Sequence, residues 1–64
     1  MKVNEIKGRI VAKGYTQEQF AQMLGMSKRT WWYRLKKKEF GSNDIKNMIK
    51  LLDIKNPMEI FFEE

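Results

Sequence analysis

Apolar residues recur at helical spacing from the start of the chain. Val3, Ile6 and Ile10 are three and four residues apart, so they share one face of a helix. Gly14 is placed to end this helix near Lys13, because glycine adopts the left-handed conformation of a helix C-terminus at little cost. The residues predicted for the opposite, polar face are Lys2, Glu5, Lys7, Arg9 and Lys13.

The next segment carries the signals of a helix start. Thr16 and Gln19 form the Thr-x-x-Gln pattern of a capping box, so a second helix is expected to begin at Gln17. It is expected to run to Leu24, about two turns, and to be broken by Gly25. The buried stripe predicted for this helix consists of Phe20, Ala21 and Leu24.

A third helix is predicted over residues 28–36, with Ser27 as its N-cap. Trp31 and Leu35 are four residues apart and are expected to share a buried face with Leu24. The side chains expected to point away from that face are Lys28, Arg29, Trp32, Tyr33 and Lys36. This helix is therefore predicted to have an outer face that is both basic and aromatic.

Two further helices complete the predicted fold. Ser42 is expected to cap a fourth helix, and Phe40 just before it is expected in the core. The apolar stripe of the fourth helix comprises Ile45, Met48, Ile49 and Leu52. Asn56, Pro57 and Glu59 form the start of a last short helix, with Pro57 at its first position. We expect an all-α fold in a single domain that spans residues 1–64.

The composition argues against most catalytic chemistry. The 64 residues include no cysteine and no histidine, so there is no disulfide, thiolate nucleophile, Ser-His pair or ordinary zinc site. No carboxylate sits in an apolar stretch that would raise its pKa. We therefore expect no enzyme activity, no metal and no cofactor. No apolar run approaches the roughly 20 residues of a membrane span, so we expect a cytoplasmic protein that does not contact a membrane.

The charge is unevenly distributed along the chain. Lys and Arg number 13 against 8 Asp and Glu, a net charge of +5. No acidic residue lies between Glu18 and Glu39, and the basic residues in that interval are Lys28, Arg29, Arg34, Lys36, Lys37 and Lys38. From Asp53 to Glu64 the sign reverses. We therefore expect a polyanion to meet the middle of the chain rather than its C-terminal end.

The second and third predicted helices form a helix-turn-helix arrangement around Gly25. In such a pair the second helix enters the major groove of DNA with its N-terminal residues at the base edges. Here those residues are Lys28 and Arg29. A helix N-terminus also attracts phosphate through its free N–H groups, which makes Gln17 and Ser27 candidate positions for phosphate contact.

Residues 16–30, Thr-Gln-Glu-Gln-Phe-Ala-Gln-Met-Leu-Gly-Met-Ser-Lys-Arg-Thr, resemble the helix-turn-helix core of the phage Cro and repressor DNA-binding domains. The resemblance extends to the helix at 45–52 and to the ending Asp-Ile-x-Asn-Pro-x-Glu-Ile-Phe. It implies a compact five-helix, lambda-repressor-like domain. It also implies a small transcriptional regulator of phage or prophage type that binds a double-stranded DNA operator with inverted-repeat half-sites as a homodimer.

The resemblance also implies roles for individual residues. At the position of Gln17, family members clamp a phosphate and orient a neighbouring side chain. Arg29 is the first candidate to read a base, a guanine, through two parallel donors, and Lys28 is the second. The residues expected at bases or groove walls are Lys28, Arg29, Trp32 and Tyr33. Those expected at phosphates are Gln17, Ser27, Lys36, Lys37 and Lys38.

Several of these residues also have a purely structural interpretation. The lysine run at 36–38 is either a solvated loop or a phosphate contact. Trp32 rests on its own helix or on Lys36 by a cation–π contact, or it lies against sugar and thymine methyl groups. The terminal aromatic segment completes the core, forms a dimer interface, or does both, and its candidate residues are Ile60, Phe61 and Phe62.

Two other functions are compatible with the sequence. One is a protein-interaction module of antirepressor or antitoxin type, which would bind a partner protein through Trp32, Tyr33 and the terminal aromatic residues. The other, RNA binding, is weaker because the major groove of A-form RNA does not admit a helix. The dimer interface is expected to be small, so the dimer is expected to form fully only on DNA.

Overall fold

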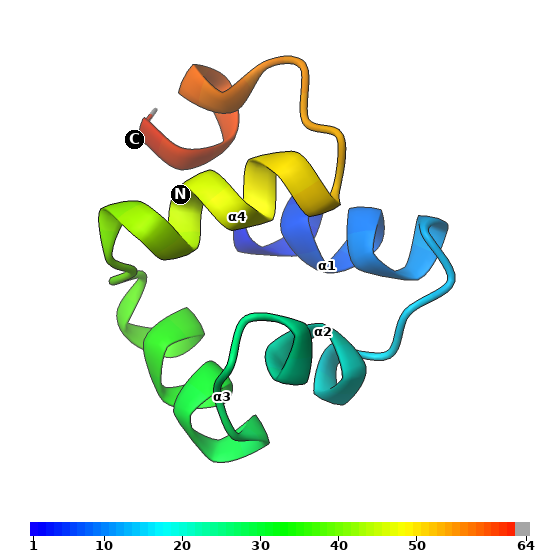
Figure 1. Cartoon of the computed structure of the whole chain (residues 1–64). Helices are drawn as coiled ribbons and strands as arrows, with labels where there is room; N and C mark the ends of the chain where they lie inside the picture. The colour runs from blue at the N-terminus through cyan, green and yellow to red at the C-terminus, as the bar shows by residue number, and fades with distance from the viewer. Residues whose placement is uncertain (63–64) are drawn as a thin grey trace.

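The computed structural model describes residues 1–62. Within them the chain forms four α-helices and one π-helical turn, with no strand. The elements are α1 (Val3–Ala12), α2 (Gln17–Met23), α3 (Lys28–Lys37), α4 (Ser42–Leu51) and η1 (Met58–Phe62). Figure 1 shows α2 and α3 together at one end of the molecule, α1 and α4 across its middle and η1 at the other end. The predicted all-α class with five helical elements is confirmed.

The ends of α2 and α3 are set by hydrogen bonds between near neighbours. Thr16 Oγ1 accepts from the backbone N–H of Gln19 at 3.0 Å, and Gln19 Oε1 accepts from the backbone N–H of Thr16 at 2.9 Å. Ser27 Oγ accepts from the backbone N–H of Thr30 at 3.1 Å. Between the helices Gly25 has a φ of +76°, in the region that favours glycine. The predicted capping box, N-cap and turn are therefore confirmed.

One cluster of apolar side chains forms the core. Its buried members are Ile6, Ile10, Phe20, Ala21, Trp31, Leu35, Met48, Leu52, Ile54, Ile60 and Phe61. The Trp31 ring lies 5.5 Å from the Phe20 ring at 76°, an edge-to-face contact, and 5.4 Å from the Phe40 ring. The predictions that Trp31 is a core residue and that Phe40 packs into the core are confirmed.

The start of α4 differs from the prediction by one residue. Gly41 is the N-cap, with extended backbone, and its carbonyl accepts the first helical hydrogen bond, from Ile45 N–H at 3.0 Å. Ser42 is the first helical residue and makes no capping hydrogen bond, so its predicted role as the cap is wrong. The ion pair between Arg34 and Asp44, at 2.8 Å, ties the first turn of α4 to α3. This contact between two helices accompanies the shifted start of α4.

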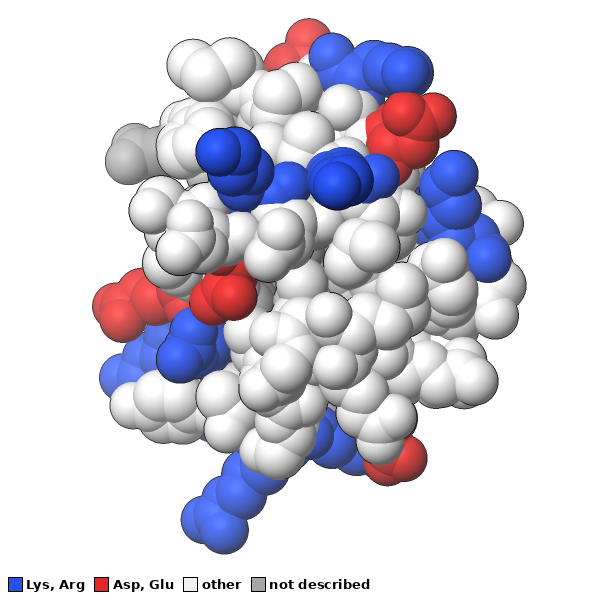
Figure 2. All heavy atoms as spheres, in the orientation of Figure 1, with Lys and Arg blue, Asp and Glu red and all other residues white. Residues whose placement is uncertain are grey.

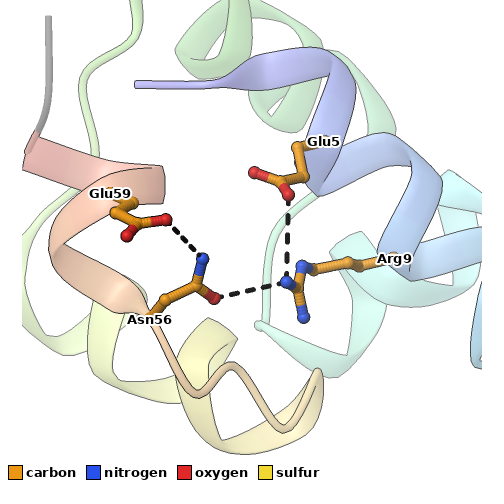
Figure 3. A network of polar contacts seen from close by, with 4 residues as sticks. All are labelled: Glu5, Arg9, Asn56 and Glu59. Carbon is orange, nitrogen blue, oxygen red and sulfur yellow. Dashed lines mark hydrogen bonds and ion pairs between the residues drawn. The ribbon is translucent and has the colours of Figure 1, made fainter.

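The last element is a π-helical turn, and two of the residues expected at its start, Asn56 and Glu59, are bonded to each other through their side chains. Glu59 Oε2 accepts from the side-chain amide of Asn56 at 3.0 Å instead of capping the backbone. Asn56 Oδ1 in turn accepts from Arg9 Nη2 at 3.3 Å. Figure 3 shows the Arg9 guanidinium between Asn56 and Glu5, whose Oε1 lies 3.9 Å from Nη2. The turn into η1 is therefore fixed by a side chain of α1.

Candidate nucleic-acid interface

The inward side of α3 determines which of its residues face solvent. Trp31 and Leu35 are 0% and 2% exposed and fix that inward side. At about 100° per residue, Arg29, Tyr33, Lys36 and Lys37 lie on the opposite side of the helix. All four are exposed. We refer to Arg29, Tyr33, Lys36 and Lys37 as the outer face of α3.

The remaining predicted contacts on α3 lie along one edge of this face. Trp32 is on the edge towards α1 and α2, and its side chain is 46% exposed. Lys28 shares that edge, where it lines a hollow with Trp32. On the outer face, Lys37 lies on the side towards the α3–α4 connection, and its Nζ is 5.9 Å from the centre of the Tyr33 ring. The structure therefore places all six predicted contact residues of α3 on its outer face or on the edge towards α1 and α2.

Gln17 is held in place from the core. The indole Nε1 of Trp31 donates to Gln17 Oε1 at 3.0 Å, which satisfies the one polar atom of a buried ring. The side chain bonded to Gln17 is therefore a buried tryptophan. Because its oxygen is engaged, the Nε2 group of Gln17 is the part of the side chain that remains as a donor.

Trp32 packs against α1. Lys7 Nζ lies 5.2 Å from the centre of the Trp32 ring, so the cation over this ring comes from α1, whereas the sequence had suggested Lys36. Trp32 also separates two surface hollows. The other residues lining the first are Thr16, Gln17, Glu18 and Lys28. The other residues lining the second are Val3, Lys7, Leu35 and Lys36.

The basic residues between Glu18 and Glu39 differ in their contacts and in the part of the surface they occupy. Arg34 is half-buried and pairs with Asp44, so its charge joins α3 to α4. Lys38 ends α3 in the left-handed conformation, with a φ of 58°. It lines a hollow with residues 1–5, beside the start of α1. The predicted phosphate contact of Lys38 would therefore come from a different part of the surface than the outer face of α3.

Charged side chains lie over much of the surface. In Figure 2, blue side chains project from the lower and lower-left edges, where Figure 1 shows α3, and red side chains lie beside them. At the upper end blue and red side chains are mixed. An exposed ion pair, Lys55 to Asp53 at 3.0 Å, illustrates this mixing. The hydrogen bond from Lys55, together with its charge, lowers the pKa of Asp53 below its ordinary value.

Comparison with known proteins gives a family. The DUF739 family, described as a protein of unknown function, matches the chain over residues 2–64. The chain belongs to the DUF739 family. No curated protein and no solved structure matches it. The description of DUF739 names no activity, so the Cro and repressor resemblance stays a prediction.

The C-terminal aromatic residues of this DUF739 chain separate into two groups. Ile60 and Phe61 are 0% and 6% exposed and belong to the core, whereas Phe62 is exposed. Met58, four residues before Phe62, is exposed as well. Of the three residues predicted for a dimer interface, only Phe62 is therefore available at the surface. Glu63 and Glu64, part of the predicted acidic end, lie outside the described residues.

Sequence reasoning missed the part that α1 plays in this DUF739 fold. Lys7 and Arg9 were assigned only to a polar outer face, yet one lies over Trp32 and the other holds Asn56. Both contacts join residues far apart in the chain, and no local pattern encodes such a pair. Among residues 1–62, no helix is long and apolar enough to cross a membrane, and no group of three or more acidic side chains is placed to hold a metal ion.

Proposed function

We propose that this chain is a sequence-specific double-stranded DNA-binding protein, a small transcriptional regulator of the phage Cro and repressor type. In this proposal α3 is the recognition helix and enters the major groove. The observation that carries it is the exposed outer face of α3, on a ten-residue helix joined to α2 by the turn at Gly25. An α-helix fits the major groove, and the second helix of a helix-turn-helix presents its N-terminal residues to the bases.

Arg29 is the residue that we propose reads a base. It is exposed in the first turn of α3, and none of the ion pairs found among residues 1–62 involves it. Its guanidinium can give two parallel hydrogen bonds to guanine, the commonest specific contact in protein–DNA complexes. Lys28 is the second candidate. Trp32 and Tyr33 then contact the groove wall or thymine methyl groups.

The proposed phosphate contacts position the protein on the duplex. They comprise Gln17, Ser27, Lys36, Lys37 and Lys38. The Ser27 hydroxyl caps α3 by accepting from Thr30 N–H. A phosphate at Ser27 would therefore be bound by the first free backbone N–H groups of α3. Gln17 would contribute its Nε2 group.

The length of the recognition helix supports a dimer. One helix reaches only a few base pairs, too few to specify a unique site in a genome. We therefore propose that two chains bind an inverted repeat, with their α3 helices in successive major grooves about 34–36 Å apart. The dimer contact would avoid the basic face of α3, because like charges there would repel. Met58 and Phe62 on η1, at the opposite end, are the exposed apolar candidates.

The test begins with selection of a preferred duplex from a random pool by the intact chain. We expect Arg29→Ala to cost about 1–3 kcal/mol on that duplex and to remove the preference at one base pair. Lys37→Ala is expected to weaken binding to all single-base variants alike. Lys50→Ala, which removes an exposed lysine of α4, is the matched control and should have little effect. Equal losses on every variant for Arg29→Ala would contradict base reading.

The stoichiometry of the complex tests the dimer separately. We expect two chains on each selected duplex and a dyad in the best site. One chain per site, or a best site without a dyad, would exclude the two-fold arrangement. Monomers in solution are compatible with the proposal, because the second chain can join on DNA.

The alternative function is a protein-interaction module, as for an antirepressor or antitoxin. The observation that favours it is the exposure of two adjacent aromatic side chains, Trp32 at 46% and Tyr33 at 63%. Exposed aromatic residues are enriched in protein interfaces. This alternative predicts no binding to any duplex even at low salt, where electrostatic contacts with DNA are strongest.

A further inference from the structure

A hollow between α1 and α3 is lined by both apolar and basic side chains. Val3, Trp32 and Leu35 provide apolar walls, and Lys7 and Lys36 provide two ammonium groups. Leu35 is only 2% exposed, so it forms the floor of the hollow. Trp32 is half-exposed and forms the wall towards Lys28 and Gln17. We refer to this feature as the Trp32 hollow.

Among residues 1–62, no acidic side chain forms an ion pair with the two lysines of the Trp32 hollow. None of the ion pairs found within residues 1–62 involves Lys7 or Lys36, and no carboxylate lines the hollow. The acidic residue of α1, Glu5, is directed to Arg9 at 3.9 Å. The contact made by Lys7 is to the face of the Trp32 ring, which a lysine can leave for a phosphate oxygen. The hollow therefore suits a ligand with an apolar part and a negative charge beside it.

We propose that the Trp32 hollow receives one deoxyribose of the DNA backbone, with the adjoining phosphate bound by Lys7 and Lys36. This inference rests on the proposed function, because Trp32 lies on the edge of the α3 face that would enter the groove. The sugar packs against the indole and Val3, and α1 becomes part of the interface. The contact adds affinity without sequence preference, since every nucleotide has the same sugar and phosphate.

The first experiment measures how binding of the intact chain to its selected duplex depends on salt. Each phosphate contact contributes about 0.9 to the slope of log K against log salt concentration. We expect Lys7→Gln to lower that slope, by at most about 0.9 because Lys36 still faces the same phosphate, and to weaken matched and mismatched duplexes by the same factor. Lys50→Gln makes the same chemical change on α4 and should keep the wild-type slope. A wild-type slope and affinity for Lys7→Gln would overturn the inference.

The second experiment follows the indole itself. Trp31 is fully buried and Trp32 is 46% exposed, so duplex binding should alter the fluorescence of Trp32 mainly. We expect a change in emission for the wild-type chain that is lost in Trp32→Phe. An equal change in both proteins would contradict a DNA contact at Trp32. Thermal melting of Lys7→Gln and Trp32→Phe shows whether either variant has lost its fold. We expect both to stay folded, because each changes an exposed or half-buried side chain.

The outcomes distinguish this inference from the proposed function. If the wild-type chain binds its duplex and Arg29→Ala weakens it while Lys7→Gln does not, the Trp32 hollow lies outside the interface and only this inference fails. If the wild-type chain binds no duplex at low salt, the proposed function fails and the inference fails with it.

Discussion

Arg29, in the α2–α3 pair at one end of the molecule, and Arg9, at the joint between α1 and η1, are used differently by the structure. In the α2–α3 pair, short caps at Thr16 and Ser27 hold the backbone and Arg29 stays exposed. At the joint, Arg9 is part of the structure, because its Nη2 holds Asn56 at the entrance to η1. Charge alone therefore does not identify a binding residue. A basic side chain is available to a ligand when no contact within the fold already engages it.

The largest expected effect separates the two neighbouring tryptophans of α3. Trp31→Ala should lower the free energy of unfolding by about 3–5 kcal/mol, because it opens a cavity between Phe20 and Phe40. Trp32→Ala should change it little, since that ring is half-exposed. Chemical denaturation of both variants measures the difference. A larger loss at Trp32 would show that the helix faces have been assigned incorrectly.

A loss of that size is comparable to the whole stability of a domain this small, so Trp31→Ala can fail to fold. Trp31→Phe is the second variant. It keeps an aromatic ring in the core but removes the hydrogen bond to Gln17 Oε1. We expect it to fold with a loss of about 1–2 kcal/mol.

The next prediction compares Arg9 with Arg29. Arg9→Ala removes the hydrogen bond to Asn56 and should lower the free energy of unfolding by about 1 kcal/mol. Arg29→Ala removes an exposed side chain of the same kind and should change stability by less than about 0.5 kcal/mol. For DNA affinity, Arg29→Ala should cause a larger loss than Arg9→Ala. Equal stability losses, measured by thermal melting, would contradict the division between structural and free arginines.

The smallest expected effect concerns the end of α3. Lys38 has a φ of 58°, a conformation that glycine adopts at lower cost. Lys38→Gly should therefore stabilise the fold by about 0.5–1 kcal/mol. Lys36→Gly, two residues earlier within α3, is the matched control and should destabilise the helix by a similar amount. Thermal melting decides the sign, and destabilisation by Lys38→Gly would show that its left-handed conformation carries no strain.

The structural features that local sequence predicted are those set by near neighbours. The capping box of α2, the Ser27 cap and the turn at Gly25 each depend on residues a few positions apart, so they could be read directly. The periodicity of α3 likewise predicted that Trp31 is buried and Trp32 faces outwards. The left-handed Lys38 could not be predicted, because no glycine marks that position.

The features that were not predicted depend on contacts across the fold. The start of α4 accompanies the pairing of Asp44 with Arg34, and the cap of η1 depends on Arg9 in α1. The approach of Lys7 to Trp32 has the same origin. For the candidate site, sequence therefore predicted which side of α3 is exposed. It did not predict that α1 borders that side, because tertiary packing determines the neighbour.

The most direct test of the proposed function is to map the surface that meets DNA. Amide chemical shifts of the intact chain would be followed by NMR as its selected duplex is added. We predict the largest shifts in the first turn of α2 and along α3, centred on Arg29 and Tyr33, with those of η1 unchanged except where a second chain contacts it. Shifts confined to α4 and η1, with α3 unaffected, would contradict the proposal that α3 is the recognition helix.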